Sequence, residues 1–331
     1  MIRTAILSAC VIGAMAGESA QADAAIERGL RALAGMQAGN GHIGSDGAGV
    51  TAMAGVAFLA GGHTPTRGAY RETQMRILRA VIAAQDRQTG YLGGNGNMYG
   101  HGFAALYLAE CYGLAPEEPV RRSLEAAIDL IWRAQNSEGG WRYSPAPVDA
   151  DMSVTVCQIM ALRAAYNAGI GGSRSVEVMN RAIQYVRNSH NGNGTFAYVL
   201  GSVGHSGEDI SEVPRAAAGV MSLIGAGFSN PNDGALGPGL AFLRRQAVPH
   251  LTATHASHFW YGQYYVAQAM FHSPELSDWD RYWRAAVPAL TRRQQSSGLW
   301  PSDGGGGTAF ASSVALIILQ IPNNYLPIFQ R

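Results

Sequence analysis

One pattern occurs six times along the 331 residues, and it restricts the possible folds more than any other feature. Each copy has an alanine-rich helical stretch, a glutamine, a glycine-containing turn and an aromatic residue, as in AAIDLIWRAQNSEGGW at 126–141. The key position falls at Gln37, Gln85, Gln135, His190, Gln246 and Gln294. The intervals of 48, 50, 55, 56 and 48 residues each accommodate two helices and two turns.

A second helical stretch follows each turn, and it is apolar nearly all round, as in HGFAALYLAECYG at 101–113. The first stretch carries charges along one face, as in RRSLEAAIDLIWRA at 121–134. We therefore predict an all-α protein in which outer amphipathic helices surround inner buried ones. A ring that closes on itself would cover the inner helices completely. The predicted fold is an α/α toroid, a closed α6/α6 barrel of six helical hairpins with a central cavity.

The composition excludes several classes of function. Charged residues make up 14%, hydrophobic residues 47%, and the net charge is +1. Such a chain is neither disordered nor a nucleic-acid binder, because the second class requires a strongly basic surface. Beyond the N-terminus no stretch reaches eighteen consecutive apolar residues, so no membrane-spanning helix is predicted there.

The N-terminus has the pattern of a secretory signal peptide over residues 1–22. Arg3 precedes an apolar stretch at 4–16, and Ala20-Gln21-Ala22 forms a small-residue cleavage site. We therefore expect export to the periplasm or exterior and a mature toroid over 23–331. Alternatively these residues extend the first helix, or Cys10 marks a lipoprotein signal. Cys111 and Cys157 lie in apolar helical patterns and are expected as buried thiols, although a single bridge between them stays open.

Two motifs resemble the squalene-hopene and related class II terpenoid cyclases. Gln135 with Gly139-Gly140-Trp141 resembles their QW repeat, and GGWRYSPAPVDADMSVTV resembles the stretch that holds their DxDD acid motif. The repeat architecture from about residue 24 onward is most similar to a bacterial group of exported, single-toroid prenyltransferase/squalene oxidase repeat proteins.

The resemblance implies an isomerase that protonates an alkene of a polyprenoid. Asp149 matches the first aspartate of the motif and Asp151 the general acid, whereas Met152 replaces the last aspartate. It also implies an apolar small molecule or polyprenoid lipid as partner, peripheral membrane contact and no cofactor. A zinc site like that of the protein prenyltransferases is not expected, because no Asp-x-Cys pair with a partnering histidine occurs.

The inner helices should begin around one mouth, which brings together residues about fifty positions apart. An alkene-protonating acid must be neutral, and burial raises an aspartate pKa. Aromatic faces stabilise cations. Besides Asp149 and Asp151, the residues expected to line the cavity or bind substrate are Tyr99, His101, Glu212, His258, Trp260, Tyr261 and Tyr264.

Other interpretations of these residues stay open. If Asp151 is the buried acid, Asp149 is expected to act as the helix cap and as its hydrogen-bond partner. Alternatively either aspartate can serve only as a helix N-cap, and the aromatic residues at 259–265 can belong to the core. The chain can then be a non-catalytic exported module that binds a lipid or a protein. A third hypothesis is a carbohydrate-active hydrolase or lyase that uses Asp151 and Glu212 as a carboxylate pair.

Overall fold

The computed structural model describes residues 2–44, 47–94, 96–202 and 209–330, with side chains from residue 19 onward except that of residue 329. These residues form twelve α-helices and no β-strand. The outer helices are α1 (Ile2–Gly35), α3 (Arg71–Ala83), α5 (Glu118–Ala134), α7 (Gly172–Asn188), α9 (Leu236–Thr252) and α11 (Leu276–Arg293). The inner helices are α2 (Gly47–Ala60), α4 (Met98–Leu114), α6 (Met152–Asn167), α8 (Val213–Gly225), α10 (Phe259–Phe271) and α12 (Gly307–Gln320). Three 3-10 turns complete the described elements: η1 (Ile210–Glu212), η2 (Ile321–Asn323) and η3 (Pro327–Phe329).

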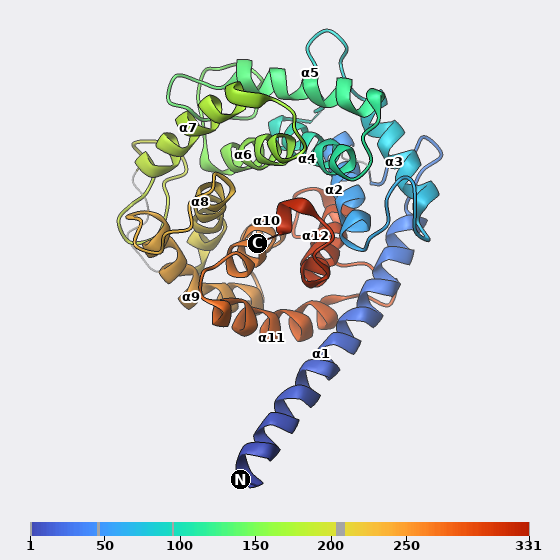
Figure 1. The fold of residues 1–331 in the computed structure, drawn as a ribbon, viewed down its shortest axis with the longest axis vertical. Helices are drawn as coiled ribbons and strands as arrows, with labels where there is room; N and C mark the ends of the chain where they lie inside the picture. The colour runs from blue at the N-terminus through green and yellow to red at the C-terminus, as the bar shows by residue number, and fades with distance from the viewer. Residues whose placement is uncertain (1, 45–46, 95, 203–208, 331) are drawn as a thin grey trace.

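The inner helices form a closed ring. Each packs against the next in the order α2, α4, α6, α8, α10, α12, and α12 packs against α2. The outer helices surround this ring, and α1 closes the circle by contacting α11 and α12 (Figure 1). The N-terminal part of α1 extends beyond the ring, whereas the C-terminal segment returns over its centre (Figure 1). The predicted α/α toroid is confirmed.

The repeated glutamine joins successive repeats. Its side-chain Nε2 donates to the carbonyl of the glycine in its own turn and to a carbonyl of the following outer helix. For Gln135 these acceptors are Gly139 O at 2.8 Å and Val178 O at 2.9 Å. The same double contact is made by Gln37, Gln85 and Gln294. Because Gln294 reaches Ala25 of α1, one of these contacts closes the ring.

The glycine of this turn is required by both its backbone and its surroundings. Gly139 has φ of 97°, a region that strains other residues. A Cβ atom there would lie 2.4 Å from the carbonyl oxygen of Arg181 on the next outer helix. Gly90 and Gly298 combine a positive φ with the same kind of close approach. The turn therefore lies directly against the neighbouring repeat.

The aromatic residue after the turn packs between helices. Trp141 and Trp300 are fully buried, and their indole N–H groups donate to Ile131 O and Leu290 O. Cys111 and Cys157 are free, buried thiols, so the bridge left open above is not formed.

We predict that Gln135→Leu destabilises the fold by about 2–4 kcal/mol. The substitution leaves the carbonyls of Gly139 and Val178 without their side-chain donor, and a buried polar group that loses its partner costs about 1–3 kcal/mol. Urea unfolding measures the loss. Gln184→Leu is the matched control, because exposed Gln184 contacts only the side chain of Asn188 on its own helix. Equal stability of the two variants would contradict the role given to Gln135.

Candidate functional site

Four inner helices share a register that is fixed by hydrogen bonds to their preceding turns. Near its start each helix carries a side chain that accepts from a backbone N–H of the turn. These acceptors are Thr51, His101, Thr155 and Ser312. They therefore occupy equivalent positions, from which depth along the ring axis can be counted at 1.5 Å per residue.

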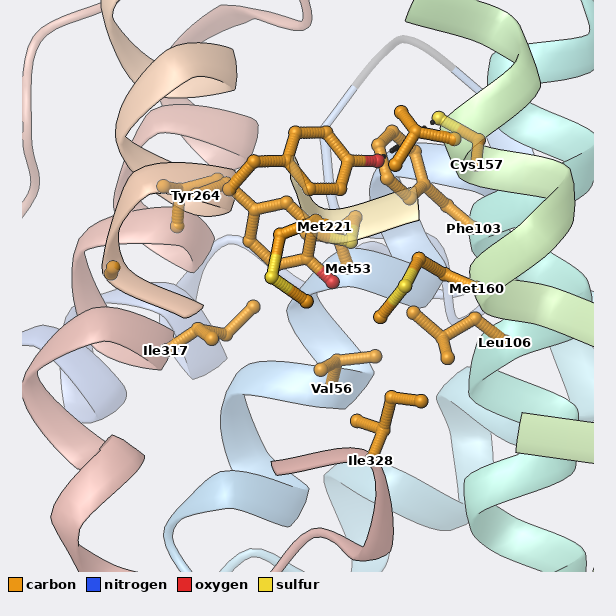
Figure 2. Packing of buried hydrophobic residues seen from close by; sticks show 14 of the residues in the cluster. Met53, Val56, Phe103, Leu106, Cys157, Met160, Met221, Tyr264, Ile317 and Ile328 are labelled. Carbon is orange, nitrogen blue, oxygen red and sulfur yellow. Dashed lines mark hydrogen bonds between the residues drawn. The ribbon is translucent and has the colours of Figure 1, made fainter. Parts of the chain in front are cut away.

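The side chains that face the ring axis lie in levels. An upper level, two residues beyond the equivalent positions, contains Met53, Phe103 and Cys157. A middle level, five residues beyond, contains Val56, Leu106, Met160 and Ile317. Figure 2 shows these residues together with Met221, Tyr264 and Ile328, which lies at the far end. All ten are buried, none more than 8% exposed. The predicted interior is thus apolar, and its walls pack closely against one another.

Asp151 is the N-cap of α6 and is fully buried. Its Oδ1 accepts from the backbone N–H of Val154 at 2.8 Å, so the side chain is held by the helix that it starts. Its Oδ2 lies 3.4 Å from the hydroxyl of Tyr198 and 3.7 Å from Nε of Arg142. Burial raises the pKa of Asp151 above its ordinary value, against the opposing effects of the Val154 N–H and Arg142. An acid with a raised pKa can deliver a proton at higher pH.

Four tyrosines, which we call the tyrosine rim, lie around Asp151: Tyr99, Tyr143, Tyr198 and Tyr261. The ring of Tyr99 lies 6.0 Å from those of both Tyr143 and Tyr261. The hydroxyls of Tyr143 and Tyr198 are hydrogen-bonded to each other. Burial raises the pKa values of Tyr99 and Tyr261, and the charge of Asp151 contributes to both shifts. Asp151 and the rim therefore form one cluster.

Arg142 binds this cluster from the solvent side. Its guanidinium lies over the rings of Tyr143 and Tyr198, with Cζ at 5.5 and 5.8 Å from their centroids. Its Nη1 donates to Oδ2 of Asp149 at 2.9 Å. Sequence reasoning did not select Arg142, Tyr143 or Tyr198. The first two lie inside the motif GGWRYS, but their direction depends on the turn geometry.

Asp149 does not have the role expected of a helix cap. Its side chain is 54% exposed and pairs with Arg142 at the surface, whereas Asp151 makes the cap hydrogen bond. The two aspartates thus differ in environment in the predicted direction, one buried and one exposed. The prediction that Asp149 is the cap is wrong. The N-cap is the residue immediately before the first helical turn, and that residue is Asp151.

Four of the expected cavity residues do not join the rim. His101 is buried in the wall, where Nδ1 accepts from Leu92 N and Nε2 lies 3.1 Å from Ala127 O. Burial lowers its pKa to about 4, so it stays neutral and structural. Glu212 is buried and paired with Arg215. His258 is exposed at the start of α10, and Trp260 donates to Pro301 O at 2.9 Å.

The three remaining expected residues are tyrosines, of which Tyr99 belongs to the rim described above. Tyr261 donates to Ser153 O at 3.0 Å and belongs to the rim. Tyr264 lies one turn deeper, 6.1 Å from Phe103 between ring centroids, and its buried hydroxyl has no hydrogen-bond partner in the described structure. Figure 2 shows its ring among the methionines that face the axis.

Glu110 is a buried acid that sequence reasoning missed. It is 2% exposed, and the backbone N–H of Ile328 in the C-terminal segment donates to its carboxyl group. Its Oε2 has no hydrogen-bond partner among the described residues. Burial raises its pKa to about 8. A signal was present, since Glu110 is the one acid in the apolar stretch HGFAALYLAECYG.

The rest of the described chain adds little to this site. A groove of about 440 Å³ lies beside α1, lined by residues that include Glu27, His63 and Tyr70, but no predicted site residue borders it. Among the described residues there is no group of three or more metal-ligating side chains. In the same part of the chain, no helix has the length and apolar character needed to cross a membrane.

Comparison with known proteins supports the fold. No family model matches the chain, and no curated protein matches it by sequence. The structure is similar to that of the type II terpene cyclase MstE from Scytonema in complex with geranylgeranyl dihydroxybenzoate, its substrate. That match has a TM-score of 0.66 and 15% identity, and it covers 94% of this chain and 99% of the cyclase.

Carbohydrate-active proteins are similar to the same degree. A cellobiose 2-epimerase from Spirochaeta thermophila matches with a TM-score of 0.69 and 14% identity over 93% of this chain and 96% of its own. An α-1,6-mannanase of Salegentibacter matches with a TM-score of 0.62 and 9% identity over 92% and 98%. At such identities the matches show the α/α toroid fold alone, and the site must distinguish between functions.

We predict that the stability contributed by Glu110 is lost as the pH rises from about 4.5 to about 8. Glu110 has a raised pKa in the folded state, so in this window its carboxyl group binds a proton in the folded protein and not in the unfolded chain. Its contribution is therefore lost at up to about 1.4 kcal/mol per pH unit. Urea unfolding at several pH values, compared with Glu110→Gln, isolates this slope. Parallel curves for the two proteins would contradict the prediction.

Proposed function

We propose that the protein binds a polyprenoid along the ring axis and that Asp151 protonates one of its alkenes, as a class II terpenoid cyclase-like isomerase. The observation that carries the proposal is a fully buried aspartate with a raised pKa at the N-terminal end of an inner helix, above the apolar levels of the ring. Protonation of an alkene requires an acid that stays neutral at working pH, and burial favours the neutral form.

The surroundings of Asp151 supply the other elements of this chemistry. The Val154 N–H fixes the carboxyl group, and the Tyr198 hydroxyl lies near its second oxygen. The rings of Tyr99 and Tyr261 lie near this acid, and the ring of Tyr264 lies one turn deeper against Phe103, so aromatic faces that can stabilise a carbocation are at hand. The middle level offers only aliphatic and methionine side chains, so it presents no base to a cation.

A carbohydrate-active enzyme is the second candidate, and the epimerase and mannanase matches favour it. Such a hydrolase needs two carboxyl groups that face one substrate. Glu212, the expected partner of Asp151, is instead buried against Arg215. The apolar levels below the rim also suit a hydrocarbon better than a sugar. A binding module without catalysis is the third candidate, and it predicts no dependence of turnover on Asp151.

We expect Asp151→Asn to abolish turnover while the fold is kept. Asparagine is as good an N-cap as aspartate, so the free energy of unfolding should change by less than about 1 kcal/mol. The variant has no acidic proton to deliver, so the rate should fall by about 10²-fold or more. Mass spectrometry of products from linear polyprenes with a geranylgeranyl chain measures the rate, and thermal unfolding measures stability.

Asp149→Asn is the matched control, because Asp149 is exposed and paired only at the surface. It should retain both turnover and stability. The same preparations should be assayed with cellobiose and α-1,6-mannan. Unchanged polyprene turnover in Asp151→Asn would contradict the proposed acid, whereas Asp151-dependent turnover of a glycan would establish the second candidate.

We also propose that the chain is exported and cut after Ala22. Next to this cleavage site, the side chain of Gln21 on α1 donates a hydrogen bond to the hydroxyl of Thr291 on α11. Cleavage would remove the part of α1 that extends beyond the ring, together with Gln21 and the buried Ala22 at the edge of the ring. The intact mass of protein from an exporting host tests this, and retention of residues 1–22 would contradict it.

A further inference from the structure

We propose that Glu110 binds the oxygen-bearing end of an elongated apolar ligand that lies along the ring axis. The inference rests on the proposed function, because it takes the axis as the place of the ligand, and it adds the chemical class of that ligand. The class is an isoprenoid chain that ends in a hydroxyl or carbonyl group.

The position of Glu110 follows from the helix period. Phe103, Leu106 and Glu110 are spaced i, i+3 and i+7 on α4, so they share one face. Figure 2 shows Phe103 and Leu106 on the axis side, and it places Ile328 at the far end. Glu110 receives a hydrogen bond from the backbone N–H of Ile328, which locates its carboxyl group at that end of the axis.

The hydrogen-bonding state of Glu110 indicates what it can bind. One carboxyl oxygen is used by the protein, and Oε2 is buried without a partner among the described residues. Because burial keeps the group protonated at neutral pH, it can both donate and accept a hydrogen bond. A ligand hydroxyl or carbonyl satisfies such a group. A buried polar group without a partner is otherwise costly, which is the reason to expect a ligand there.

The distance between the two acids sets the length of the ligand. In the register of the inner helices, Asp151 precedes its equivalent position by four residues and Glu110 follows it by nine. Thirteen residues at 1.5 Å each separate the two levels by about 20 Å. A ligand that reaches both must be an extended chain. Tyr264 projects from α10, opposite α4 in the ring, and its unpartnered hydroxyl offers a polar contact between them.

Room for such a chain has to come from side-chain movement. Met53, Met160 and Met221 all face the axis (Figure 2). Methionine is unbranched with three rotatable bonds, so it repacks around an apolar ligand more readily than leucine or isoleucine. Ile328 lies in the C-terminal segment after the last inner helix, where movement would leave the ring of helices intact.

The test compares three probes of equal chain length: geranylgeraniol, the matching aldehyde and the matching hydrocarbon. Equilibrium dialysis gives their Kd values for the wild type, Glu110→Leu and Glu110→Gln. We expect the wild type at pH 7 to bind both oxygenated probes about tenfold more tightly than the hydrocarbon, which corresponds to one hydrogen bond. Glu110→Leu should lose this preference, because a buried hydroxyl or carbonyl without a partner costs free energy. Its affinity for the hydrocarbon should be retained, and this retention shows that the variant is folded.

The dependence on pH distinguishes a direct contact from a structural effect. The aldehyde only accepts, so its preference in the wild type should disappear above pH 8, when Glu110 loses its proton. Glu110→Gln keeps a donor at every pH and should show no such change. The titratable groups that the charge of Glu110 affects are Cys111 and Tyr264. Burial raises the pKa of Cys111 to about 12 and that of Tyr264 well above its ordinary value.

The outcomes separate this inference from the proposed function. An oxygenated-probe preference that survives in Glu110→Leu, or equal binding of all probes by the wild type, overturns the role of Glu110 alone. Absence of binding by any probe overturns the axial ligand and the proposed function together. Loss of polyprene turnover in Asp151→Asn beside an unchanged preference in Glu110→Leu leaves only the proposed function standing.

Discussion

The double hydrogen bond of the repeated glutamine joins one hairpin to the next at four junctions, including the one that closes the ring. A helical hairpin cannot bury its inner helix alone, so each repeat depends on its neighbours. Gln135 ties its own turn to α7, and Gln294 ties the last turn to α1. The glycine of the same turn permits this contact, because any Cβ atom there would meet the carbonyl of the adjoining helix. Closure of the ring is thus encoded in a polar contact at its outer edge.

The same turn fixes how deep each inner helix lies. Its backbone N–H binds Thr51, His101, Thr155 or Ser312, which have different chemistry at one geometric position. Histidine is a common catalytic residue, but His101 has a structural role here, because it accepts a hydrogen bond from the turn before α4. The levels below follow from this register, with a polar rim, an apolar middle and a single acid at the far end. The candidate functional residues are those that the register leaves free to face the axis.

The fold was predictable because its signals are local and repeated. The glutamine, the glycine turn and the tryptophan each act within one repeat and its neighbour, and six copies reinforce one another. The site was less predictable because it depends on side-chain direction. Asp149 and Asp151 are one residue apart, yet one pairs with Arg142 at the surface and the other is buried. Tyr198 comes from a different repeat, and only the folded ring brings it to Asp151.

A toroid shared by a terpene cyclase, an epimerase and a mannanase leaves function to the interior surface. Sugars require many hydrogen-bonding groups that face the ligand, because each hydroxyl buried without a partner costs free energy. Below the tyrosine rim, three buried side chains on α4 and α10 have an oxygen without a hydrogen-bond partner among the described residues: Glu110, Tyr264 and Gln268. That number matches a hydrocarbon chain with few oxygen atoms and falls short of what a sugar needs. The scarcity of polar groups along the axis, more than the presence of any one acid, therefore favours an isoprenoid ligand.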